Sequence, residues 1–214
     1  MRPSDCRFSR PHYRISNREA FGTVSDLRNW ISQYEQTREK EPRGAAIIRH
    51  AMLELAKLVA DDPSELPHIE WRDLERMLGA ALGGLGFEVC VTRPGKDGGF
   101  DLEVRDSKAA DGATYLVEVK HWTDQKPGAK HLTKLVRVRA ARKATAALLL
   151  STSGFTSTVF SGIAELEAPV RLADGGKVIS ICRAYCRLSS GLFLEARDLH
   201  AMLFADTAAL GPHL

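Results

Sequence analysis

The sequence predicts an α/β fold in which a mixed β-sheet is flanked by helices and preceded by an N-terminal helical extension. Short strand-like segments follow one another closely between residues 87 and 120, which favours an antiparallel meander. A helix-length segment then leads to the apolar run at 145–151, which favours a right-handed crossover to a parallel strand. Together these two patterns predict a sheet with antiparallel and parallel halves.

The first 62 residues form the expected extension. Residues 1 to about 20 are rich in Arg, Ser and His without periodicity, which is typical of a loosely held arm. Apolar residues then recur at helical spacing after Ser25 and again after Gly44. We therefore expect an arm and helical extension at 1–62 and the main domain at 63–214.

The remaining elements follow from periodicity and from turn residues. Gly86 ends the first helix of the main domain, and Gly98 and Gly99 permit a tight turn between the first two strands. The predicted helices lie at 67–85, 129–144, 157–166 and 192–204, and the predicted strands lie at 87–92, 100–105, 114–120, 145–151 and 178–181.

Opposite charges interrupt the strand at 114–120. Because strand side chains alternate, Glu118 and Lys120 share one face of this strand. Asp101 lies at the start of the preceding strand, and Asp97 before it is better explained as a turn-capping residue. Two carboxylates can hold a hard divalent cation, and an ammonium can orient the attacking water, so this set suits phosphodiester hydrolysis. An exposed strand edge with a cross-strand ion pair is the structural alternative.

A further carboxylate lies on the helix at 67–85. At 100° per residue, Glu75 falls between Trp71, Leu78 and Leu82 on the apolar stripe. It either reaches water from the edge of the stripe or points to the strand ends near Asp101 as a supporting acid.

Three neighbouring features each leave two interpretations open. His121 is a proton shuttle or phosphate donor, or else a solvated or core-capping residue. Trp122 stacks on a base or, as we favour, packs under the loop. The segment Ser151–Thr156 holds a phosphate through hydroxyls and backbone N–H groups, or is an N-cap region only.

Positive charge is concentrated in one segment, although the formal net charge is only +3. From Lys126 to Lys143 there are seven Lys or Arg residues and no Asp or Glu. A solvated helix usually carries both acidic and basic side chains. A segment with basic side chains alone therefore favours contact with phosphates. Leu132, Leu135 and Val136 project to the opposite side of the helix. We name the cationic strip by its four members, Lys126, Lys130, Lys134 and Arg137.

The ordered series of motifs resembles the Mrr-type restriction endonuclease domain of the PD-(D/E)xK nuclease superfamily, from about residue 54 to about residue 181. The motifs are Leu74-Glu75, Leu85–Val89, Asp97–Asp101, Val117–Lys120, Ser151–Thr156 and Leu172–Gly176. The resemblance implies a restriction-endonuclease-like fold, with Asp101, Glu118 and Lys120 at the catalytic positions and Glu75 at that of the helix-borne acid. Many members carry Gln where this chain has Glu118, and Pro is absent before Asp101.

The sequence and the resemblance together predict a magnesium-dependent endonuclease that acts on double-stranded DNA in restriction or defence. Asp101, Glu118 and the Val119 carbonyl would hold Mg²⁺, for which Mn²⁺ could substitute. A homodimer would ease cleavage of both strands. The alternatives are a non-cleaving DNA-binding module with the same fold and a structure-selective nuclease similar to a junction resolvase. No nucleotide cofactor is expected.

The sequence contains no apolar run long enough for a membrane span and no secretory signal, which favours the cytoplasm. Its four cysteines lack the paired spacing of a zinc site and are expected to be reduced thiols.

Overall fold

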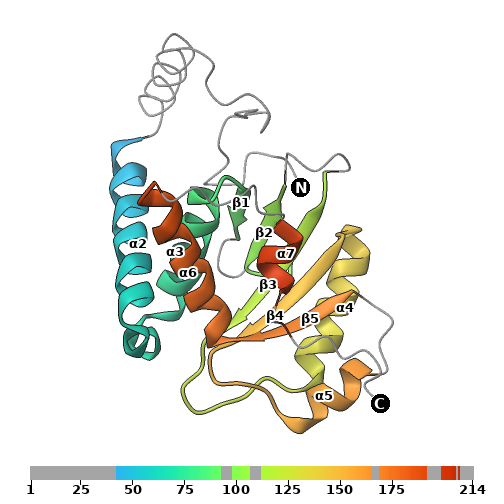
Figure 1. The fold of residues 1–214 in the computed structure, drawn as a ribbon. Helices are drawn as coiled ribbons and strands as arrows, with labels where there is room; N and C mark the ends of the chain where they lie inside the picture. The colour runs from blue at the N-terminus through green and yellow to red at the C-terminus, as the bar shows by residue number, and fades with distance from the viewer. Residues whose placement is uncertain are drawn as a thin grey trace.

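The computed structural model describes residues 42–92, 98–106, 112–164, 169–191, 199–205 and 207 (Figure 1). The helix expected after Ser25 and the turn residue Asp97 lie outside these ranges. The helices are α2 (Arg43–Asp61), the 3₁₀ helix η2 (Pro63–His68), α3 (Trp71–Gly84), α4 (Ala129–Arg142), α5 (Ser157–Ala164), α6 (Gly175–Ser189) and α7 (Leu199–Phe204). The strands are β1 (Glu88–Val91), β2 (Leu102–Arg105), β3 (Thr114–Lys120), β4 (Ala146–Ser151) and β5 (Val170–Asp174).

The five described strands form one mixed sheet in the order β1-β2-β3-β4-β5. Strands β1, β2 and β3 pair antiparallel, whereas β3, β4 and β5 pair parallel. The change of direction falls on β3, where Val117 pairs with Leu102 of β2 and Leu148 of β4. The structure therefore confirms the predicted mixed sheet.

Helices cover both faces of the sheet (Figure 1). Helices α2, α3, α6 and α7 pack on one face, over alternate strand residues such as Val117 and Leu148. Helices α4 and α5 pack on the other face, where Leu132 and Leu135 of α4 meet Leu116. Successive side chains of β3 thus point alternately into two separate apolar clusters.

Helix α2 belongs to the first of these clusters. Its Ala56 and Val59 are fully buried together with Leu74 and Leu78 of α3. The guanidinium Nε of Arg183 on α6 donates to the Ala60 carbonyl at 3.2 Å. The described part of the predicted extension is therefore packed into the core, and the boundary at residue 62 stays a prediction.

The fifth strand differs from the one expected at 178–181. Strand β5 lies earlier, and residues 178–181 form part of α6. Val178, Ile181 and Cys182 recur at helical spacing and are buried against the first apolar cluster. The Asp174 carboxylate accepts a hydrogen bond from the Gly176 amide at 2.9 Å and caps the helix. Tertiary packing and this cap outweigh the strand preference of the β-branched run.

Two further expectations are tested in part. Cys182 and Cys186 are free thiols, but Cys90 is disulfide-bonded, so the expectation of reduced cysteines is wrong there. Among the described helices, none combines the length and the apolar character needed to cross a bilayer.

Candidate active site

Asp101 is fixed by two contacts with β3 at the end of the sheet where β2 begins. Its backbone N–H donates to the Val117 carbonyl at 2.9 Å. Its side-chain Oδ2 accepts from the Val119 N–H at 2.7 Å. The carboxylate of Asp101 is therefore held beside the strand that carries Glu118 and Lys120.

Glu118 and Lys120 form an ion pair along β3, with 2.6 Å between Oε1 and Nζ. Both side chains are largely withdrawn from solvent, with exposed fractions of 6% for Glu118 and 17% for Lys120. The second carboxylate oxygen of Glu118, Oε2, is buried and has no hydrogen-bond partner. A buried carboxylate oxygen without a partner is costly unless a ligand binds it.

The sheet brings these three residues to one place, as the alternation in the sequence predicts. Val117 and Val119 point into the first apolar cluster, so Glu118 and Lys120 lie on the opposite face of β3. The alternative interpretation of an exposed strand edge is wrong, because β3 lies between β2 and β4 in the sheet and Glu118 is buried.

Glu75 of α3 is also buried, with an exposed fraction of 2%. Burial raises the pKa of its carboxyl to about 7, and the negative charge of Asp101 acts in the same direction. The neighbouring cations Arg72 and Lys120 oppose this rise in pKa. Glu75 therefore does not reach water from the stripe edge, and it lies within electrostatic range of Asp101 and Lys120.

Arg72 connects Glu75 to the end of β1. Its Nη1 donates to Glu75 Oε2, and its Nη2 donates to the Thr92 carbonyl. Thr92 in turn donates its N–H to the Asp101 carbonyl at 2.8 Å and its hydroxyl to the Phe100 carbonyl at 3.0 Å. The sequence-based prediction missed Arg72, although its opposite charge three residues before Glu75 was an available signal.

His121 holds together segments on both sides of the site. Its Nδ1 lies 2.7 Å from Thr152 Oγ1, and its Nε2 lies 2.9 Å from the Ile69 carbonyl just before α3. Because a carbonyl only accepts, Nε2 is assigned the proton. The core-capping interpretation fits both contacts.

Trp122 and the hydroxyls that follow β4 pack internally. The Trp122 ring contacts the His131 ring edge-on at 5.3 Å, and Lys120 Nζ lies 5.7 Å from the centre of the Trp122 ring. Ser153 donates its hydroxyl to the Gln125 carbonyl at 2.6 Å. The Thr152 and Ser153 hydroxyls thus fasten the loop after β3. The half-buried Trp122 ring packs against His131 of α4, and whether it also stacks on a base is not tested by these contacts.

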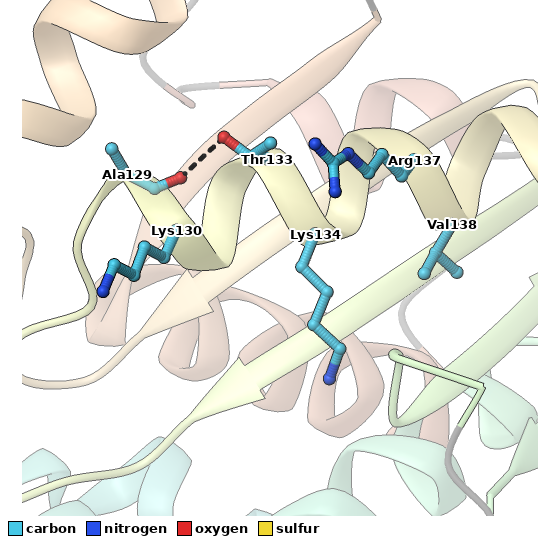
Figure 2. Close-up of a pocket in the computed structure, with 6 residues that line it drawn as sticks. All are labelled: Ala129, Lys130, Thr133, Lys134, Arg137 and Val138. Atoms are coloured by element: carbon cyan, nitrogen blue, oxygen red, sulfur yellow. Dashed lines mark hydrogen bonds between the residues drawn. The ribbon is translucent and has the colours of Figure 1, made fainter.

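The cationic strip faces solvent beside the Gly98–Gly99 turn. Figure 2 shows Lys130 and Lys134 extending from the same side of α4, in a shallow groove. Ala129, Lys130, Thr133, Lys134, Arg137 and Val138 line this groove. All four members of the strip are exposed, with Lys126 in the loop before α4 and the other three on α4, while Leu132 and Leu135 on the other side of α4 are buried.

Gly99 brings the groove close to the catalytic candidates. Its φ is +89°, and a Cβ there would lie 3.0 Å from Lys134 Cε and 2.7 Å from a methyl carbon of Val138. Helix α4 therefore packs directly on the turn that leads into Asp101. A polyanion in the groove would pass next to that turn.

Asp101 and Glu118 are the two carboxylates that the sequence predicts as metal ligands at this end of the sheet. Among the residues that the structure describes, no group of three or more His, Cys, Asp or Glu is arranged to hold a metal ion.

The chain is similar to restriction endonucleases. The family model Mrr_cat, described as a restriction endonuclease, matches residues 66–182. The uncharacterized protein y4cE of Sinorhizobium fredii is 32% identical over 185 residues, which cover 85% of this chain and 47% of that protein. The chain thus spans about half the length of this curated relative.

Two solved structures are also similar, each with a TM-score of 0.39 and 18% sequence identity. One is the DNA modification-dependent restriction endonuclease AspBHI, matched over 68% of this chain and 38% of that chain. The other is the MspJI restriction endonuclease in complex with a 27-mer oligonucleotide, matched over 81% of this chain and 38% of that chain.

Proposed function

The chain belongs to the Mrr restriction endonuclease family, and from this premise we propose that it is a divalent-metal-dependent endonuclease that hydrolyses phosphodiester bonds of double-stranded DNA. One observation carries the proposal: Asp101, Glu118 and Lys120 meet at one end of the sheet, with Glu118 Oε2 buried and without a partner. We further propose a role in restriction or defence against foreign DNA.

The residues present fit a magnesium ion. Glu118 Oε2 is a buried acceptor that a cation would satisfy, and Asp101 is held beside Val119 by the 2.7 Å hydrogen bond. Asp101, Glu118 and the Val119 carbonyl would hold Mg²⁺ or Mn²⁺. A bound divalent cation polarises the phosphate and lowers the pKa of a bound water.

Lys120 supplies the second part of the chemistry. Its ammonium is held 2.6 Å from Glu118 Oε1 and next to the face of Trp122, so its position is restricted before substrate arrives. From there it can orient the attacking water by hydrogen bonding and stabilise negative charge on the phosphate.

The cationic strip would contact the DNA backbone. Lys130, Lys134 and Arg137 line the groove beside the Gly98–Gly99 turn, which places positive charge along an approach to Asp101. Phosphate contacts of this kind are independent of sequence. Two such chains in a homodimer would provide one site for each strand.

The test is nicking of supercoiled plasmid, methylated and unmethylated, in Mg²⁺, Mn²⁺ or EDTA. Asp101→Ala and Glu118→Ala should abolish cleavage by removing metal ligands, while DNA affinity is unchanged or rises because a negative charge facing phosphate is removed. Lys120→Ala should leave Mg²⁺ binding measurable by calorimetry and still stop turnover. Wild-type cleavage by both Asp101→Ala and Lys120→Ala would contradict the assignment.

A non-cleaving DNA-binding module is disfavoured by the site itself. Such a module has no use for two carboxylates that face a polyanion, one of them buried with an unpartnered oxygen. Parallel assays on a plasmid, a linear duplex and a four-way junction separate a duplex endonuclease from a binding module and from a junction resolvase.

A further inference from the structure

We infer that Arg72 is a positioning residue of the candidate active site, which fastens the Glu75 carboxylate to the end of β1 and so fixes its spacing from Asp101. The inference rests on the proposed nuclease function and deepens it. Arg72 was not among the residues that the sequence motifs singled out.

The first observation is the geometry of the guanidinium. Its two terminal nitrogens go to different elements: Nη1 donates to Glu75 on α3, and Nη2 donates to the Thr92 carbonyl just after β1. A planar guanidinium holds both acceptors at a fixed separation, which a single ammonium on a flexible stem cannot do. Arg72 therefore sets the position of Glu75 relative to the end of β1.

The second observation is that Thr92 continues the connection to Asp101. Two hydrogen bonds join Thr92 to the segment before β2: its N–H donates to the Asp101 carbonyl at 2.8 Å, and its hydroxyl donates to the Phe100 carbonyl at 3.0 Å. A continuous series of hydrogen bonds thus runs from Glu75 through Arg72 and Thr92 to the backbone of Asp101. The series crosses from the helix layer to the segment before β2 that carries the candidate metal ligand.

The third observation is the cost of the arrangement. The Arg72 side chain has an exposed fraction of 16%, and its Nε is buried without a hydrogen-bond partner. Desolvation of a guanidinium with one donor left unpaired is unfavourable, and an apolar contact between α3 and β1 would often stabilise the fold as well or better. Stability of the fold is therefore a poor explanation for Arg72.

The fourth observation is the charge environment of Glu75. Glu75 and Asp101 are both acidic, and the charge of Asp101 disfavours the ionised form of Glu75. Arg72 and Lys120 both oppose this effect, and Arg72 also donates a hydrogen bond to Glu75 Oε2. Arg72 offsets this repulsion and holds the carboxylate toward the strand ends.

The first experiment compares Arg72→Met with Arg76→Met in plasmid nicking with Mg²⁺. Arg76 is a matched control, because it is an exposed arginine of the same helix that pairs with its neighbour Asp73 at 3.0 Å. Arg72→Met should lower the cleavage rate by about 10- to 100-fold, the range typical of residues that orient a ligand or catalytic group. Arg76→Met should remain within about twofold of wild type, as surface substitutions do.

A double-mutant cycle with Glu75→Gln separates positioning from a general effect on the fold. If Arg72 acts through Glu75, Arg72→Met should have little further effect in the Glu75→Gln background, and the double variant should cleave within about threefold of Glu75→Gln alone. A cleavage rate equal to the product of the two single effects would overturn the inference.

Hydrogen exchange gives a readout that does not depend on cleavage. The Thr92 amide should exchange faster in Arg72→Met than in Arg76→Met, because its hydrogen bond to the Asp101 carbonyl is then less well held. Equal Thr92 exchange in the two variants would overturn the inference. If the wild-type chain cleaves no plasmid in Mg²⁺ or Mn²⁺, the proposed function fails instead, and the exchange data still report on the connection.

If Arg72→Met unfolds at the assay temperature, Arg72→Lys replaces it. Lysine keeps the charge but lacks the planar fork that fixes the separation between the Glu75 carboxylate and the Thr92 carbonyl, so cleavage should still fall. Wild-type cleavage and wild-type Thr92 exchange in Arg72→Lys would overturn the inference.

Discussion

Glu75 is held where its ionised form is disfavoured. Its pKa is raised from 4.5 to about 7, mainly by burial and then by the charge of Asp101. A carboxyl whose pKa is higher in the folded than in the unfolded chain contributes stability that is fully present below about pH 4.5. That contribution is lost as the pH rises through about 7.

Replacing Glu75 by Gln should therefore stabilise the fold at alkaline pH. The variant cannot ionise, so its free energy of unfolding should exceed that of wild type by about 3 kcal/mol at pH 8 and should match it near pH 4. Urea denaturation in EDTA at several pH values measures this difference. The same pH dependence in Glu75→Gln and wild type would show that another group is responsible.

The same substitution should reduce function. Cleavage by Glu75→Gln is expected to fall by about one to two orders of magnitude, because a supporting acid near the metal site is lost. A variant that is more stable and less active would identify Glu75 as a residue retained for catalysis. Full activity of Glu75→Gln would show that Glu75 has no role in cleavage.

At the scale of the element, α4 joins an apolar face to the cationic strip. Reversing the charge of Lys130 and Lys134 to Glu should weaken binding to all DNA sequences alike. It should also reduce the slope of log affinity against log salt by about two, since each lost phosphate contact removes close to one unit. Filter binding or fluorescence anisotropy over a range of salt concentrations measures both effects.

The matched control for the strip carries the same change of net charge elsewhere. Lys57 of α2 and Arg76 of α3 are exposed cations on helices that cover the other face of the sheet. Their reversal to Glu should leave the salt slope close to that of wild type. A similar loss of slope in both double variants would mean that net charge, and not the strip, governs binding.

The elements also show how far the sequence can predict the structure. Strand β3 is found at the predicted residues, and Glu118 and Lys120 share a face as alternation requires. The fifth strand was predicted at 178–181 because Val178 and Ile181 suit a strand locally, whereas packing on other elements and the Asp174 cap make this segment helical. The connection from Arg72 to Thr92 was missed because it spans 20 residues, which local patterns do not reveal, whereas the pairing of Arg72 with Glu75 spans only three residues and was an available signal.

At the scale of the whole molecule, α2 links the N-terminal part of the chain to the nuclease core. Deleting residues 1–41 leaves α2 in place, whereas deleting residues 1–62 removes Ala56 and Val59 from the first apolar cluster. It also removes the carbonyl that accepts from Arg183. We therefore expect residues 42–214 to fold and residues 63–214 to be much less stable.

Thermal melting followed by circular dichroism compares the two truncated chains. The shorter chain should melt well below the longer one, because it loses Leu53, Ala56 and Val59 from the core, and loss of a buried Leu side chain alone costs about 2–5 kcal/mol. Equal melting temperatures would support the predicted boundary at residue 62. A nicking assay on the longer chain would show whether residues 1–41 are needed for cleavage.

The alternation along β3 makes the site and the core depend on a single register. A slip of one residue against β2 would move Val117 and Val119 to the site and force Glu118 and Lys120 into the first apolar cluster. An insertion or deletion within β3 would therefore cost solubility and activity together. Length changes can accumulate only in connections such as the one between β2 and β3, which is closed by the hydrogen bond from Asp106 N–H to the Ala113 carbonyl. A lineage of such chains can thus vary its loops widely while the spacing between Glu118 and Lys120 stays unchanged.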